Sequence, residues 1–128
     1  MSLLTHDERR VEVPRSFETY AWLFMRASAV LLIPLVWIHV ALQDVLVGVH
    51  AIDLDYVALR WATLGWRIYD IALLGLAFAH GMNGMRNVLH DYVHKAAHQR
   101  VLDGGLLAIW AVVTAMGALA IVGGVRMP

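Results

Sequence analysis

Long apolar runs separated by shorter polar connections dominate the chain. The runs cover residues 20–43, 66–90 and 102–125, and each is about as long as a helix that crosses the hydrocarbon core of a bilayer. Pro34 lies inside the first run, where a membrane helix tolerates proline with a kink. The pattern predicts an all-α fold with three transmembrane helices, whose two chain ends lie on opposite sides of the membrane.

The polar segments divide the rest of the chain. Residues 1–19 mix acidic and basic side chains without an apolar run, which predicts an aqueous N-terminal arm rather than a signal peptide. Residues 20–128 then form a three-helix membrane anchor domain. The first connection, residues 44–65, is too charged to span a bilayer but keeps an apolar side. Within it, residues 55–61 are predicted to form a short helix that lies in the membrane interface.

Composition supports a membrane protein and excludes several functions. The chain is 60% hydrophobic with zero net charge when histidine is neutral, and its mean hydropathy is +0.64, far above that of a soluble domain. No basic stripe is present, so nucleic acid is not expected as a partner. The absence of cysteine excludes disulfides, thiolate zinc sites and cysteine-bound iron–sulfur clusters within this chain.

Lysine and arginine are unevenly shared between the two sides of the membrane. One side holds Arg9, Arg10, Arg15, Lys95 and Arg100, and the other holds Arg60, Arg67 and Arg126. Because the positive-inside rule counts these residues, it predicts that the N-terminal arm and the second connection are cytoplasmic.

His80 is the strongest candidate for chemistry. Ionisable residues inside a membrane span are costly, so they indicate function by default. Haem iron takes neutral imidazole as an axial ligand, and a bis-histidine haem needs histidines from two facing helices. Gly84 lies one turn later on the same helix face, where a small residue lets the macrocycle approach. The alternative is a structural histidine that bonds a neighbouring helix.

Other ionisable residues allow two interpretations each. Arg26 either snorkels to the headgroups or pairs with a buried anion such as a haem propionate. His39 is either an interfacial residue or a ligand. By helix rise, His39 and His80 differ in depth by about 13 Å, so they cannot ligate the same haem, and His39 would serve a second, outer haem. The evenly spaced histidines at positions 90, 94 and 98 are read as a solvated helix end in preference to a metal site.

The spacing His80-x-x-x-Gly84-x-x-x-x-x-x-Asp91-Tyr92 resembles the second-helix motif of the small D-type membrane anchor of succinate dehydrogenase, the cytochrome b556-type hydrophobic anchor of respiratory complex II. The resemblance implies that His80 is an axial ligand of haem b and that Tyr92, with Asp91 beside it, contacts the quinone. The start of the first span is also similar to the first helix of the family, where a basic residue approaches the haem propionates. The resemblance therefore implies that Arg26 contacts a propionate. Arg86 and His90 would then stabilise the reduced quinone or relay protons.

The same resemblance implies a role in electron transport and the tricarboxylic acid cycle, in a bacterial plasma membrane. The chain would form half of a heterodimeric haem-binding bundle with a second, C-type membrane anchor. It would pass electrons from the iron–sulfur protein of the complex, reduced by the flavoprotein, to menaquinone or ubiquinone. The resemblance is compatible with either one or two haem b groups. It is also compatible with assembly of the complex into a trimer of heterotetramers. The chain alone is not catalytic. The alternatives are the anchor of a fumarate reductase and a membrane scaffold or assembly protein without haem.

Overall fold

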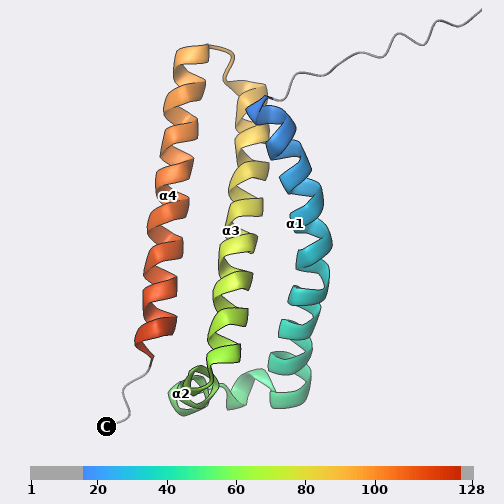
Figure 1. The fold of residues 1–128 in the computed structure, drawn as a ribbon, viewed down its shortest axis with the longest axis vertical. Coiled ribbons are helices and arrows are strands. Elements are labelled where there is room, and N and C mark those ends of the chain that lie inside the picture. The colour runs from blue at the N-terminus through green and yellow to red at the C-terminus, as the bar shows by residue number, and fades with distance from the viewer. Residues whose placement is uncertain (1–15, 125–128) are drawn as a thin grey trace, which may run out of the picture.

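The computed structural model describes residues 16–124, and all its regular elements are helical. In chain order they are α1 (Phe17–Val40), the π-helical turn η1 (Ala41–Val47), the 3-10 turn η2 (Val49–Ala51), α2 (Leu54–Ala62), α3 (Leu64–Tyr92) and α4 (Ala96–Gly123). Helices α1, α3 and α4 run side by side with α3 between the other two, and α2 lies across one end (Figure 1). The prediction of an all-α fold is confirmed.

Local chemistry sets where the helices begin and end. Ser16 and Asp53 precede α1 and α2, and each side chain accepts a hydrogen bond from the backbone N–H three residues on, at 3.4 and 2.8 Å. Such caps satisfy N–H groups that the first helical turn leaves free. Gly48 and Gly124 follow η1 and α4 with φ of +84° and +66°, a region that residues with a Cβ rarely adopt.

The predicted boundaries shift where helix extends past the apolar runs. Helix α1 begins inside the predicted arm, at Phe17, because Ser16 caps it, and α4 begins at Ala96 rather than at residue 102. Hydropathy predicts which residues lie in the bilayer core, but it does not predict where a helix ends. A helix can continue into water where the sequence contains residues of high helix propensity. The short helix predicted over residues 55–61 is confirmed as α2, while its place in the membrane interface stays a prediction. Residues 1–15 of the predicted arm and residues 125–128 lie outside the described residues.

Two helical stretches in the described part are long and apolar enough to cross a membrane, Phe17–Val47 and Ala96–Gly123. Helix α3 qualifies only together with α2, to which it is joined at a bend of 106°. The number of spans is therefore two, or three when the bent pair counts as one. The polar residues that mark α3 as a candidate functional helix are also the ones that lower its hydropathy.

The described part has a polar interior and an apolar exterior. Ile121 is its only buried apolar residue, while Ser28, Arg60 and Arg86 are buried polar residues. Large apolar side chains such as Trp37, which is 71% exposed, cover the outside. An apolar surface of this extent requires lipid or partner helices to cover it.

Close approach between α3 and α4 depends on a glycine. A Cβ added at Gly117 would collide with the side chain of Leu74 on α3, so the leucine occupies the space that the missing side chain leaves. Gly75 on α3 faces Thr114 on α4 in a looser version of the same contact. Small residues at a helix interface let two backbones approach in this way.

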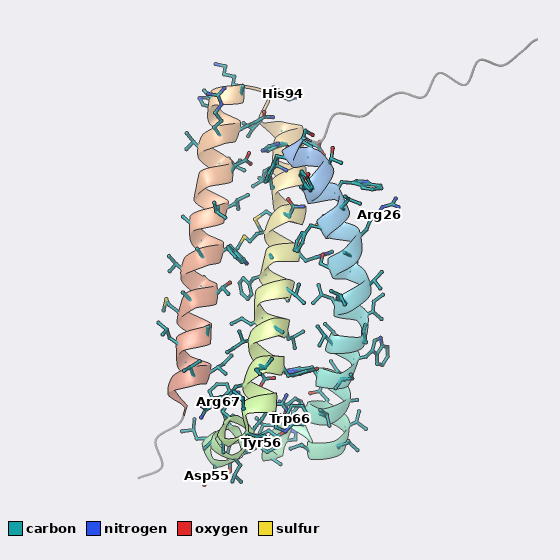
Figure 2. The ribbon with its side chains drawn as sticks, in the orientation of Figure 1. Arg26, Asp55, Tyr56, Trp66, Arg67 and His94 are labelled. Atoms are coloured by element: carbon teal, nitrogen blue, oxygen red, sulfur yellow. The ribbon has the colours of Figure 1, made fainter. Side chains whose placement is uncertain are left out.

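A buried ion pair fixes α2 across the end of the bundle. Arg60 donates two hydrogen bonds to Asp70 on α3, at 2.9 and 2.8 Å, and Trp61 Nε1 donates a third to the same carboxylate at 2.9 Å. The guanidinium also lies 4.2 Å from the ring centre of Trp66, which Figure 2 places where α2 meets α3. The sharp bend between α2 and α3 is therefore held by specific side-chain interactions.

We expect Asp70→Asn to release α2. The substitution leaves the buried Arg60 without its counter-charge, and breaking such a pair costs about 3 kcal/mol. Unfolding of the protein in mixed micelles, as SDS replaces a mild detergent, measures the loss of stability. Asp55→Asn is the matched control, since Asp55 is exposed on the same helix as Arg60. Equal stability of the two variants would contradict a structural role for the pair.

Candidate functional site

His80 faces α1 from the middle of α3 and is held there by a serine. Its Nδ1 lies 2.8 Å from Oγ of Ser28, a residue that is only 1% exposed. The serine Oγ is in turn 2.6 Å from the carbonyl oxygen of Phe24 on its own helix. No described residue bonds the other ring nitrogen of His80, Nε2. The imidazole is therefore anchored through one nitrogen and free at the other.

Gly84 lies one turn beyond His80 and also faces α1. A Cβ built at this glycine would lie 3.7 Å from Cε of Met25, an ordinary van der Waals distance. The side chain of Met25 thus fills the space next to Gly84 in this chain. A haem contact at Gly84 stays a prediction.

Arg86 is the centre of a charged cluster that joins three helices at one end of the bundle. Its guanidinium is paired with Glu18 of α1, and its Nε donates to Asp103 of α4 at 3.0 Å. His90 Nε2 lies 2.7 Å from the same carboxylate, and Phe17 presents its ring 5.0 Å from the guanidinium carbon. Because Arg86 is 7% exposed and already has two carboxylate partners, its predicted direct contact with a quinone would compete with these ion pairs.

Asp91 and Tyr92 do not join this cluster. Both are exposed at the end of α3, and Tyr92 is 77% exposed. At about 100° of rotation per residue, Tyr92 lies on a different side of α3 from Arg86 and His90. The structure therefore brings together Arg86 and His90 but separates them from the Asp-Tyr pair. Any site at Tyr92 needs walls from outside the described residues 16–124.

Arg26 points away from His80. It is exposed on α1 and lies over the ring of Trp22, 4.1 Å from the ring centre. Figure 2 shows it directed outward from α1 on the side opposite α3, as expected two residues before the inward-facing Ser28. The structure does not bring Arg26 to the predicted haem ligand, and its pairing with a propionate stays a prediction.

His39 lies at the other end of the α1–α3 contact. It lines a cavity of about 320 Å³ with Gln43, Asp70 and residues of α2. Within this cavity region, Nδ1 of His39 and Oε1 of Gln43 are buried without a hydrogen-bond partner. Eleven residues separate His39 from Ser28, or about 16 Å along α1. His39 and His80 therefore lie at different levels of the bundle, as their helix positions predicted, and a haem at His39 stays a prediction.

A second cavity lies between α3 and α4 beside the Arg86 cluster. It has a volume of about 400 Å³ and is lined mainly by apolar side chains, among them Trp110 and Met82. Asn83 also lines it, and its Nδ2 is buried without a partner. The sequence analysis missed this face, although the polar residues at positions 83, 86 and 90 repeat at helical spacing and would have indicated it.

The evenly spaced histidines do not converge. His90 bonds Asp103, while His94 lies in the connection between α3 and α4 (Figure 2) and His98 is exposed on α4. Over residues 16–124, no three histidine and acidic side chains are grouped so that they could hold a metal ion.

We expect Arg86→Gln to weaken the joint between α1, α3 and α4. The substitution removes the charge that pairs with Glu18 and Asp103, and charge-assisted hydrogen bonds of this kind contribute about 2 kcal/mol. A lower thermal midpoint of the detergent-solubilised complex would report the loss. Arg100→Gln removes an exposed arginine from α4 and serves as the control. The cluster would be shown to be dispensable if both variants melted together with the unmodified protein.

Comparison with known proteins agrees with this architecture. The sequence model of a protein family, described as the succinate dehydrogenase/fumarate reductase transmembrane subunit, matches residues 6–121. Comparison with individual curated proteins gave no match. The matched range includes α1, α2 and α3 completely and most of α4, and the apolar helices are those of an integral membrane protein. The chain therefore belongs to the succinate dehydrogenase/fumarate reductase transmembrane subunit family.

Proposed function

We propose that this chain is the D-type membrane anchor of a succinate:quinone oxidoreductase, in which it ligates haem b and forms part of the quinone-reduction site. Family membership supports a place in such a complex. The observation that carries the finer assignment is the environment of His80. Its Nδ1 is bonded to Ser28 inside the membrane helices, and Nε2 has no bond to a described residue.

The surroundings of His80 are suited to a role as haem ligand. A neutral imidazole binds iron through one nitrogen while the other is held by a protein partner. His39 is about 16 Å away along the bundle, so this chain supplies one axial histidine at the depth of His80. The second would come from the C-type membrane anchor. When bound, the haem supplies a one-electron carrier between the iron–sulfur protein and the quinone.

Tyr92 is the proposed quinone contact. Its phenol donates a hydrogen bond to a quinone carbonyl, and its ring suits the membrane interface. Quinone reduction also consumes two protons, and the exposed Asp91 beside it is placed to carry protons from water. Arg86, whose charge is balanced by Glu18 and Asp103, holds the end of α3 that carries Tyr92 rather than contacting the quinone itself.

The remaining assignments follow the same proposal. The lysine and arginine distribution supports a cytoplasmic N-terminus in a bacterial plasma membrane, and the flavoprotein and iron–sulfur protein would dock on that side. An outer haem at His39, the propionate role of Arg26 and assembly into a trimer stay predictions. A fumarate reductase anchor differs in the direction of the reaction, which redox potentials determine. A scaffold without haem remains the alternative from another class.

We expect His80→Ala to remove the haem b spectrum or to weaken it severely. The substitution deletes the ligand and leaves the helix intact. The measurement is the reduced-minus-oxidised absorbance spectrum of the purified complex, normalised to protein. His94→Ala, at an exposed histidine in the connection after α3, should leave the spectrum unchanged. A full α band in the His80 variant would overturn the ligand assignment and favour the scaffold.

We expect Tyr92→Phe to lower succinate–quinone reductase activity while succinate oxidation by a water-soluble dye is retained. The substitution removes only the hydroxyl that contacts the quinone. Tyr20→Phe is the matched control, since Tyr20 is another exposed tyrosine at the same end of the bundle. Equal losses in the two assays would show misassembly instead of a quinone site.

A further inference from the structure

Ser28 is the most deeply buried residue in the described part of the chain, at 1% exposure. A polar side chain in that place, on a helix whose outer surface is apolar, needs an explanation. Its Oγ lies 2.6 Å from the carbonyl oxygen of Phe24, 3.3 Å from that of Met25 and 2.8 Å from Nδ1 of His80. The first two contacts lie within α1, and the third crosses to α3.

Counting protons fixes the direction of these bonds. The hydroxyl of Ser28 has a single hydrogen, and a backbone carbonyl can only accept. At 2.6 Å, the Phe24 carbonyl and Oγ need that hydrogen between them. The serine therefore has only a lone pair to offer His80, and Nδ1 must donate. Of the two neutral tautomers of the imidazole, this direction therefore selects the one with its proton on Nδ1, which leaves a free lone pair on Nε2.

The partner of Nδ1 is a hydroxyl rather than a carboxylate. No carboxylate of the described residues bonds His80: Asp70 is engaged by Arg60, and Asp103 by Arg86 and His90. A carboxylate would draw the proton from Nδ1 and give the ring anionic character, whereas a hydroxyl leaves it neutral.

We infer that Ser28 is a positioning residue for His80, which fixes the imidazole tautomer and ring orientation so that Nε2 is presented to the haem iron. The inference rests on the proposed function, because it assumes that His80 binds haem. It adds a second residue, on a different helix, to the ligand site. Without Ser28, Nδ1–H is buried without a partner and the ring is free to rotate or to change tautomer.

The test uses the complete membrane complex with Ser28→Ala and Ser28→Thr. The first readout is the rate at which haem transfers to excess apomyoglobin, and the second is the largest g value in the EPR spectrum of the oxidised haem, which reports imidazole orientation. Loss of such a supporting partner weakens metal binding by about 10- to 100-fold. We expect Ser28→Ala to lose haem faster by a comparable factor with a shifted g value, and Ser28→Thr to restore both.

Thr114→Val is the matched control, because it removes a buried hydroxyl that has no partner, on α4. It should leave both readouts unchanged. An unchanged transfer rate and g value in Ser28→Ala, with haem lost in His80→Ala, would overturn the positioning role and keep the proposed function. Retained haem in His80→Ala would instead overturn the proposed function itself. If Ser28→Ala does not assemble, the same two readouts on Ser28→Cys, a weaker acceptor, decide the inference in the same way.

Discussion

Polar groups within a membrane must find their partners inside the protein, because hydrocarbon offers none. In this chain that constraint organises the whole bundle. Over residues 16–124, the three buried polar residues each join helices: Ser28 links α1 to α3, Arg60 links α2 to α3, and Arg86 links α3 to both α1 and α4. Since lipid removes most of the hydrophobic drive for helices to associate, these bonds contribute the directional part of the packing.

The same bonds set the register, and the register sets the depth of each candidate site. Ser28 opposite His80 fixes how far α1 lies along α3, and the pair of Glu18 with Arg86 fixes the same alignment a few turns nearer the end. With that alignment His39 can only fall at the level of Asp70. The polar groups of the described residues are thereby divided among a cluster at one end of the bundle, a central histidine and a cavity at the other end, rather than gathered into one site.

Hydropathy was enough to predict the helical fold and the short helix α2, because each depends on local sequence, and the cost of placing an ionisable residue in a membrane span singled out His80 as a candidate. These arguments could not predict which residues pair with each other across helices. Glu18 and Arg86 are 68 residues apart in the sequence, and Ser28 and His80 are 52 apart. A single serine in an apolar run has no periodic signal, and Asp103 stood at the start of the third predicted span, where nothing in the sequence linked it to Arg86 and His90. Pairing across helices depends on register, which hydropathy does not encode.

On the proposed function, the chemistry of the chain depends on assembly. His80 would offer one imidazole where a bis-histidine haem needs two, and Tyr92 would present to the quinone a phenol that is 77% exposed in the described part of the chain. The apolar exterior, which includes Trp37, likewise lacks a surface to cover it. On the proposed function, each site is finished by the surface that also buries these side chains, so docking of the partner proteins and completion of the electron path are one event. An isolated anchor would then lack both a fully ligated haem and an enclosed quinone, which keeps its redox chemistry confined to the assembled complex.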